Sequence, residues 1–207
     1  YQTFFVPTGQ STAPEATSLV LRRAQPNDLA AMETLYSEEA SKRTFSPVYD
    51  FASIGNDAYF AGLELADFIL AFSGGELVGM IGLWDQSRFK RIRVTAYSPV
   101  IAWTRPALNC FSGVKLPPIG GVIPTTSGVA CAIRGSCPMI LNALLRRAVS
   151  RMPKGKLFVL GFDEQDPLVG GLKGLKARSE FGKHFLVSFG NKAPIRSDLF
   201  AFDAARI

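Results

Sequence analysis

Runs of apolar residues separated by turn signals predict several short β-strands in the first half of the chain. Residues 18–23 form one such run, and residues 68–72 and 77–84 form two more, joined by a Ser-Gly-Gly-Glu turn. Two β-type runs joined by a Gly-Gly turn are typical of an antiparallel hairpin. A further extended segment is expected over residues 89–100.

Two helices are predicted between the first strand and the hairpin. Residues 29–41 carry apolar side chains at helical spacing, which places Glu33, Glu38 and Glu39 on the outer face. Residues 57–65 show a similar but shorter pattern. The first half of the chain therefore predicts a strand, two helices and a hairpin in that order.

The second half predicts a strand, a helix and another strand in succession. An apolar run at 128–133 leads through a short turn into a strongly patterned helix, and residues 156–162 form an apolar run typical of a buried strand. Residues 168–175 favour a weak helix, because glycine costs a helix about 0.8–1 kcal/mol per residue. A last hairpin is expected from residues 184–189 and 199–202.

These elements predict one domain over residues 18–207 with an α/β fold, in which a mixed, largely antiparallel sheet is flanked by helices. Residues 1–17 lack the features of a signal peptide, and we interpret them as an N-terminal tail. Residues 102–127, rich in proline and glycine, are expected to form an irregular insertion, with a short helix possible over 102–111.

The composition is that of a folded protein with a basic excess. Hydrophobic residues make up 47% of the 207 positions, and 23 lysines and arginines outnumber 17 acidic residues. No apolar run approaches the roughly 20 residues that a membrane span requires. A net charge of +6 favours acidic partners such as nucleic acid, anionic lipid or a polyphosphate. The charge is spread along the chain, and its densest cluster, from Arg88 to Arg93, is typical of a solvated strand face.

The cysteines and the histidine argue against a metal site and a disulfide framework. Cys110, Cys131 and Cys137 lack the spacing of either, and the one histidine is His184. This pattern fits a reducing, cytoplasmic compartment. Cys137 lies at an expected helix N-terminus, which lowers the pKa of a thiol, but no histidine lies near it in sequence to assist a nucleophile.

The order of the elements and several motifs resemble the GNAT family of N-acetyltransferases. The motifs that carry the resemblance are LRRA (21–24), FILAFSGGELVGMIG (68–82), LWDQ (83–86), LGF (160–162) and DPL (166–168). Three of these motifs, LWDQ, LGF and DPL, are similar to sequences of a bacterial branch of that family. The resemblance covers about residues 18–203 and implies a GNAT-like acyl-CoA N-acyltransferase fold.

The turn between the strand at 128–133 and the following helix is the candidate cofactor site. A helix N-terminus offers unpaired N–H groups and the positive end of the helix dipole, which suit an anion. The family binds the pyrophosphate of coenzyme A there, with a loop of the type Arg/Gln-x-x-Gly-x-Gly/Ala. Here Arg134 matches the first position, the glycine pair is absent, and Pro138 removes a backbone donor.

The resemblance implies acetyl-CoA or another acyl-CoA as cofactor. Its expected binding residues are Cys131, Ala132, Ile133, Arg134, Gly135, Ser136, Cys137 and Met139. The alternative is an ordinary helix N-terminus with Ser136 as its cap and Pro138 in its first turn.

Acyl transfer to an amine requires a base for the amine and an acid for the departing thiolate. Asp163 and Glu164 follow a buried strand at the sheet edge where α/β proteins usually bind ligands, so they are candidate catalytic residues. The alternative is a turn and helix-cap role for these residues and Asp166, because Asp-Pro-Leu (166–168) is also a helix-start pattern. The family's acid is often a tyrosine after the fifth strand, and this sequence has no tyrosine beyond Tyr97. The resemblance places the acceptor substrate near Trp84, Asp85, Gln86 and Tyr97, although Trp84 equally suits a core.

Three functions follow from these observations. The first is an N-acetyltransferase that passes an acyl group from acetyl-CoA, or another acyl-CoA, to an unknown small-molecule or protein amine. The second is a catalytically inactive binding module that uses the opening between the fourth and fifth strands for a metabolite or a protein partner. The third, nucleic-acid binding through residues 88–93, ranks last because few aromatic residues are interleaved with the basic ones. The sequence does not decide between a monomer and a homodimer.

Overall fold

The structure is a computed structural model that describes residues 1–10, 18–111, 115–183, 199–203 and 205. The strands of the main sheet are β1 (Gln2–Pro7), β2 (Val20–Arg23), β3 (Phe68–Ser73), β4 (Glu76–Trp84), β7 (Thr125–Ile133), β8 (Leu157–Phe162) and β9 (Arg178–Phe181). A separate two-stranded ribbon consists of β5 (Ile92–Arg93) and β6 (Val122–Ile123). The α-helices are α1 (Leu29–Ala40), α2 (Pro99–Phe111) and α3 (Pro138–Arg151). Short 3-10 helices are η1 (Pro26–Asp28), η2 (Ala58–Phe60), η3 (Leu65–Asp67), η4 (Arg134–Ser136) and η5 (Pro167–Leu172).

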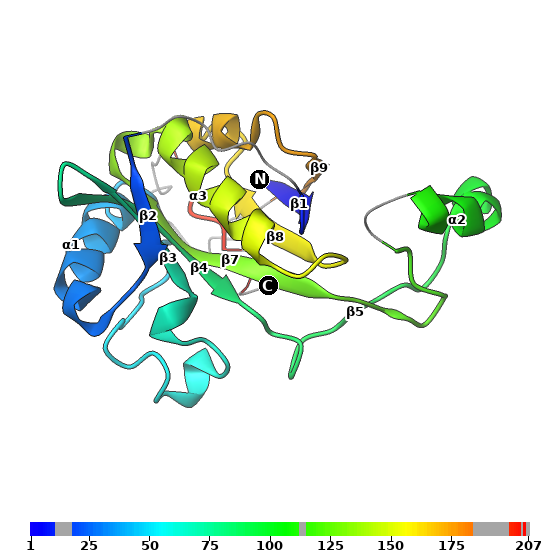
Figure 1. The fold of residues 1–207 in the computed structure, drawn as a ribbon, viewed down its shortest axis with the longest axis horizontal. Coiled ribbons are helices and arrows are strands. Elements are labelled where there is room, and N and C mark those ends of the chain that lie inside the picture. Colours follow the sequence, from blue (N-terminus) through cyan, green and yellow to red (C-terminus); the bar gives the residue numbers. More distant parts are fainter. Residues whose placement is uncertain (11–17, 112–114, 184–198, 204, 206–207) are drawn as a thin grey trace, which may run out of the picture.

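The seven strands of the main sheet lie in the order β2-β3-β4-β7-β8-β1-β9 (Figure 1). β7 and β8 are parallel and are joined through α3, whereas the other neighbouring strands pair antiparallel. The predicted α/β fold class, a mixed and largely antiparallel sheet flanked by helices, is confirmed.

Side chains alternate between two hydrophobic cores on opposite faces of the sheet. Phe68 and Leu70 of β3 belong to one core, and Ile69 and Ala71 belong to the other. This period of two follows from strand geometry, which points successive side chains to opposite faces. Into the first core α1 contributes Met32, Leu35 and Tyr36, and into the second α3 contributes Leu141, Leu144, Leu145, Ala148 and Val149. The two helices therefore cover opposite faces.

The start of the chain is part of the sheet. β1 lies between β8 and β9 and pairs antiparallel with both strands. Its side chains Phe4 and Val6 are buried in the core beneath α3. The prediction of a tail over 1–17 is therefore wrong for residues 2–7. A six-residue strand whose partners lie 150 or more residues away gives no local signal that separates it from a tail.

Other predicted elements differ in type or extent. Residues 57–65 contain η2 and the start of η3 where a helix was expected, and most of 89–100 is not strand. The predicted strand over 199–202 is reduced to one parallel bridge between Phe200 and Thr44. The predicted strand at 184–189 lies outside the described residues. β9 was not predicted, because its burial pattern is exposed throughout and gives no apolar alternation.

The insertion between β4 and β7 has a structure of its own. The short ribbon of β5 and β6 leads outward to α2, which lies apart from the sheet at one end of the molecule (Figure 1). We call residues 88–111 and 115–124 the arm. The helix expected over 102–111 is confirmed, and it begins earlier, at Pro99.

Candidate functional site

A cleft opens in the sheet where the two parallel strands separate. β7 and β8 pair from Thr125–Leu157 to Ser127–Val159. Beyond that point β7 follows β4, and β8 follows β1. A β-bulge lies just beyond Ser127, where Ala130 has a φ of 45°. This bulge bends β7 away from β8. A non-glycine residue rarely adopts such a φ, so the surrounding structure holds the divergence in place.

The cleft contains a cavity of about 70 Å³. Its walls come from β7, from the end of β8 with the loop that follows, from the end of α1, and from the C-terminal segment Leu199–Asp203. The charged residues that line it are Glu39, Arg43, Asp163, Asp166 and Asp203. Four carboxyl groups and one guanidinium therefore line this cavity; the guanidinium is paired with Asp166, and Glu39 is paired with Lys42. The excess of carboxyl groups favours a cationic ligand.

At the open end of the cleft, η4 leads β7 into α3. Gly135 and Ser136 both have a positive φ, of 63° and 50°, and form a sharp turn. Cys137, and not Ser136, is the N-cap residue of α3, and no side chain caps this helix. The predicted Ser136 cap is therefore wrong. Pro138 occupies the first turn of the helix, as expected, where its missing N–H carries little cost.

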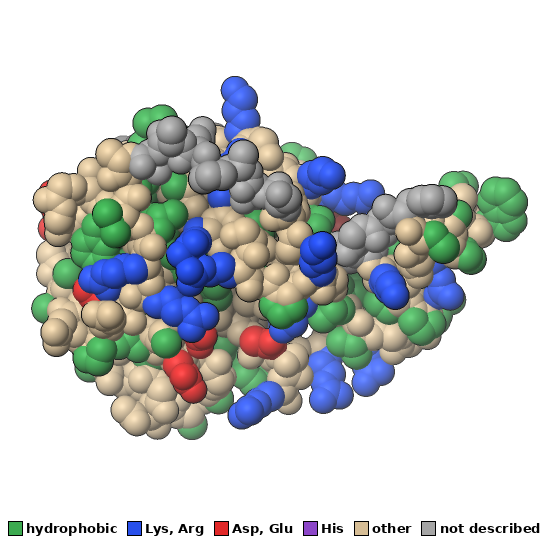
Figure 2. Space-filling model, viewed as in Figure 1, with side chains coloured by type: hydrophobic (Ala, Val, Ile, Leu, Met, Phe, Trp, Pro, Cys, Tyr) green, Lys and Arg blue, Asp and Glu red, His purple; other side chains and the backbone are tan. Residues whose placement is uncertain are grey.

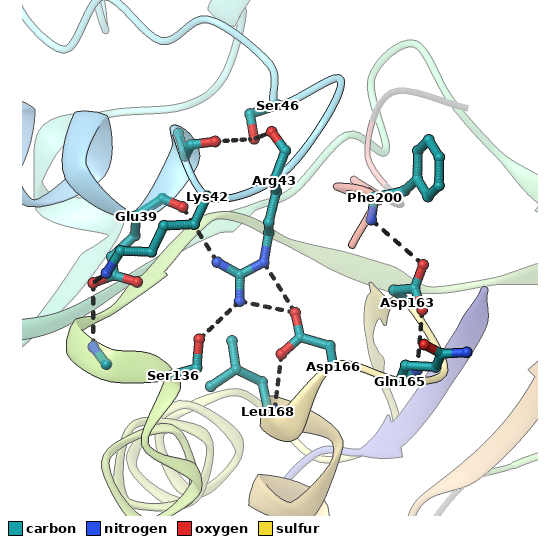
Figure 3. A network of polar contacts seen from close by, with 12 residues as sticks. Glu39, Lys42, Arg43, Ser46, Ser136, Asp163, Gln165, Asp166, Leu168 and Phe200 are labelled. Atoms are coloured by element: carbon teal, nitrogen blue, oxygen red, sulfur yellow. Dashed lines mark hydrogen bonds and ion pairs between the residues drawn. The ribbon is translucent and has the colours of Figure 1, made fainter. Parts of the chain in front are cut away.

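The backbone N–H of Gly135 is already bound by a carboxylate of the chain. It donates a hydrogen bond to Glu39 Oε1 at 3.2 Å, and Lys42 Nζ donates to the same oxygen at 2.6 Å (Figure 3). The Glu39 side chain is 2% exposed, although the helical pattern placed it on the outer face. Its second oxygen, Oε2, has no hydrogen-bond partner among the described residues. An unpaired buried acceptor costs about 1–3 kcal/mol, so a ligand that donates to it would be stabilised.

Arg43 and Asp166 form a buried ion pair across the mouth of the cavity. Arg43 Nε and Nη2 donate to Asp166 Oδ2 at 3.0 and 2.8 Å. Arg43 Nη2 also donates to Ser136 Oγ at 3.2 Å, so one guanidinium ties the end of α1 to both η4 and η5 (Figure 3). Asp166 Oδ1 accepts from the N–H of Leu168 and caps η5. The predicted cap role of this Asp-Pro-Leu motif is confirmed.

Arg134, the residue that matches the pyrophosphate loop, is held on the surface by acidic residues. Its Nη1 lies 3.3 Å from Glu38 Oε2, and its Nη2 lies 3.2 Å from Glu76 Oε1. The side chain of Arg134 is 40% exposed. Of the other expected cofactor residues, Ala132 and Ile133 are buried in the two cores, and Met139 is exposed.

Asp163 and Glu164 occupy different surroundings. Asp163 lines the cavity, and its two oxygens accept from the N–H groups of Gln165 and Phe200 at 3.0 and 3.4 Å (Figure 3). Glu164 is exposed and does not line the cavity. The structure therefore separates the two predicted catalytic carboxylates.

The C-terminal segment Leu199–Asp203 occupies part of the cleft. It is anchored to Thr44, whose N–H donates to Leu199 and whose carbonyl accepts from Ala201. The Phe202 ring stacks on Tyr1 with 4.0 Å between ring centroids. A Cβ atom at Gly161 of β8 would lie 1.9 Å from the same Phe202 ring. The absence of a side chain at Gly161 thus lets this ring pack directly on the strand.

Cys131 lines the cavity from β7. Burial raises the pKa of its thiol to about 12, so this thiol stays protonated near neutral pH. Cys137 is partly buried, and His184 lies outside the described residues. In the described ranges, no group of three or more His, Cys, Asp or Glu side chains is placed to hold a metal ion.

The residues predicted to bind the acceptor substrate do not line this cavity. Trp84 is buried in the core and donates to the carbonyl of Ala61, and Asp85 pairs with Lys156 at 2.7 Å. The remaining two are held by hydrogen bonds: buried Gln86 bonds to Ser127 and Ala205, and Tyr97, in the arm, donates to Pro117.

Glu39 and Arg43 are the site residues that the sequence analysis missed. Glu39 stands seven residues after Met32 and four after Leu35, which are both buried on the inner face of α1. This spacing places Glu39 on the buried face of α1, and it was the sequence signal that could have identified Glu39 as a site residue. The charge of its side chain had suggested a position on the solvent-exposed face.

Comparisons with known proteins found matches among solved structures only. No family model matches the chain, and no curated protein matches it. Among solved structures, the chain is similar to a GNAT-family acetyltransferase from Streptococcus agalactiae, at 10% identity and a TM-score of 0.34. The match covers 66% of this chain and 71% of that chain. The assignment of the fold class rests on the strand order and on the divergence of β7 and β8 described above.

Proposed function

We propose that the protein is a binding module of acetyltransferase-like architecture that receives the cationic end of a small ligand, such as an ammonium group, in the cleft between β7 and β8. The observation that supports this most directly is Glu39. Its carboxylate is buried at the cavity, and one of its oxygens has no partner among the described residues. A charged donor would satisfy this oxygen with a charge-assisted hydrogen bond.

The same carboxylate disfavours an acyl-CoA ligand in the arrangement described. The resemblance assigns the pyrophosphate to the turn at Gly135, where Glu39 already accepts the N–H. A phosphate there would have to displace the Glu39 carboxylate, which is paired with Lys42, from the Gly135 N–H. A cavity of about 70 Å³ also has room for an end group and not for the length of a coenzyme A arm.

Thermal unfolding with matched small probes tests the proposal. Ethylammonium should stabilise the wild-type protein, since a ligand selective for the folded state raises the unfolding temperature, and ethanol at the same concentration should not. Glu39→Gln should abolish the stabilisation. Glu38→Gln is the matched control, because Glu38 is the neighbouring carboxylate and its side chain is 48% exposed. Equal responses of the two variants to ethylammonium would contradict the proposal.

A second candidate function is N-acetyl transfer from acetyl-CoA or another acyl-CoA. It is favoured by the divergence of β7 and β8 and by the sharp turn at Gly135, which lies at the open end of the cleft. In this case the residues from Cys131 to Cys137 together with Met139 would hold the cofactor, and Asp163 or Glu164 would act as base. Glu39 and the segment Leu199–Asp203 would both have to move away for the cofactor to enter.

Coenzyme A titration separates the two candidates. The binding module predicts no thermal shift with millimolar coenzyme A, whereas the acetyltransferase predicts a shift that Arg134→Ala reduces. Release of free thiol from acetyl-CoA in the presence of an amine series would then give the activity directly. A clear shift with coenzyme A and none with ethylammonium would replace the first candidate by the second.

A further inference from the structure

The arm is an ordered element with its own internal hydrogen bonds. Tyr97 donates to the carbonyl of Pro117 at 2.7 Å, and Arg105 donates to the same oxygen at 3.2 Å. The Asn109 side chain both donates to the carbonyl and accepts from the N–H of Leu116. These bonds fix α2 to the segment at Leu116 and Pro117 that precedes β6. The projection seen in Figure 1 is therefore supported by specific contacts along its length.

The arm holds the entire charge excess of the protein. Its basic residues are Arg88, Lys90, Arg91, Arg93, Arg105 and Lys115, and it has no aspartate or glutamate. The other 17 basic residues of the chain balance the 17 acidic ones. The sequence pattern had suggested a dispersed charge. The fold instead gathers the excess on one projection, with Lys90 at its base close to Asp203 of the body.

The arm also exposes large apolar side chains, half of them on α2. Trp103 is 86% exposed and Val100 is 72% exposed. The exposed apolar residues of the arm are Phe89, Ile92, Val100, Ile101, Trp103, Leu108, Ile119 and Val122, which is eight of the fourteen such residues in the described ranges. Figure 2 shows green side chains at the tip of the arm and blue side chains along the arm toward the body.

We propose that the arm docks on a membrane surface that contains anionic lipids, with α2 lying in the interface. A tryptophan and branched aliphatic side chains at the tip suit the boundary between headgroups and acyl chains, and the basic residues behind them suit anionic headgroups. Among the described residues, no helix is long and apolar enough to cross a bilayer. The arm would therefore lie on the membrane without spanning it. This inference is independent of the ligand proposed for the cleft.

The same observations disfavour the other occupants of such a surface. Nucleic acid would use the basic residues, but it offers no environment for exposed Val100 and Ile101. A second copy docking arm to arm would bring two projections together that each carry six basic and no acidic residues. A lipid surface satisfies the charge and the apolar tip together.

Vesicle sedimentation with the full chain tests this inference. The protein should bind vesicles of phosphatidylcholine with phosphatidylglycerol, bind poorly to phosphatidylcholine alone, and dissociate as salt is raised. Neutralising Arg88, Arg91 and Arg93 to glutamine should weaken vesicle binding about a hundredfold. Each basic residue near an anionic surface raises the affinity about fivefold. Neutralising Lys173, Lys176 and Arg178, three exposed residues of the body, is the matched control and should change little.

Tryptophan fluorescence reports the apolar contact separately. Trp84 is buried and Trp103 is exposed, so a blue shift on vesicle binding would come from Trp103. Val100→Ser should reduce vesicle binding, whereas Phe181→Ser, at an equally exposed site on β9, should not. Equal binding by the arm and body variants would overturn the inference. Tighter binding to duplex DNA than to anionic vesicles at the same salt concentration, or dimerisation through the arm without vesicle binding, would also overturn it.

Discussion

Arg43 and Asp166 lie 123 positions apart in the chain and form an ion pair at 2.8 Å that joins the end of α1 to the start of η5. The Asp166 side chain is 2% exposed and that of Arg43 is 12% exposed. Because Arg43 also donates to Ser136, the pair joins the end of α1 to both η4 and η5. The site therefore depends on one contact between distant parts of the sequence.

Removing one partner of this pair should be strongly destabilising. Arg43→Met leaves the Asp166 carboxylate buried and without its cation, which typically costs about 3–5 kcal/mol. Urea unfolding measures the change in free energy. The exposed pair between Arg134 and Glu38 provides the control, and Glu38→Ala should cost less than about 1 kcal/mol. Similar losses in the two variants would show that burial of the Arg43 pair contributes little.

Deleting residues 1–10 should prevent stable folding. The deletion removes β1 from the interior of the sheet, leaves β8 with an unpaired edge and separates β9 from the other strands. Far-UV circular dichroism and a solubility assay give the readout. Substituting Gln10 with Ala, at the end of the same segment, is the control and should leave the fold intact. A soluble deletion variant with a wild-type unfolding temperature would show that β1 is dispensable.

A methyl group at Gly161 should displace the C-terminal segment from the cleft. In Gly161→Ala the new Cβ would collide with the Phe202 ring, and overpacking of this kind costs about 1–3 kcal/mol. Limited proteolysis should then cut near Phe202 faster than in the wild type. Gly170→Ala is the control, because its Cβ would meet Pro138 at an ordinary 3.4 Å. Unchanged proteolysis of Gly161→Ala would mean that the segment shifts without leaving.

Cys131 should resist alkylation in the folded protein. With a thiol pKa of about 12, the reactive thiolate forms only as the pH rises toward that value, and it is roughly one part in ten thousand at pH 8. Iodoacetamide at pH 8 should therefore label the exposed Cys110 first. Peptide mapping by mass spectrometry identifies the modified residue. Rapid labelling of Cys131 without denaturant would contradict the burial of its thiol.

Much of the fold could be predicted because its signals are local. The hairpin of β3 and β4 has a Gly-Gly turn between two apolar runs, and β7, α3 and β8 follow a plain strand-helix-strand pattern. β1 and β9 could not be predicted in the same way. Their pairing with each other joins segments about 175 residues apart, and neither segment carries a turn that would identify its partner.

For the candidate site, the sequence located the turn at Gly135 but not what binds it. Local physics gives a helix N-terminus the same appearance whether its N–H groups meet a phosphate or a carboxylate. Glu39 was assigned to the solvent because glutamate is usually exposed, and its burial follows from Lys42 and the Gly135 N–H around it.

The sequence by itself determined the class of fold, since periods of 2 and 3.6 in the apolar pattern specify strands and helices without knowledge of their partners. It also determined the total charge and the small residues of the Gly135 turn. The tertiary structure decided where the charge excess projects, which carboxylate occupies the turn, and that the start of the chain completes the sheet. Each of these depends on contacts between residues far apart in sequence, and no local pattern encodes such contacts.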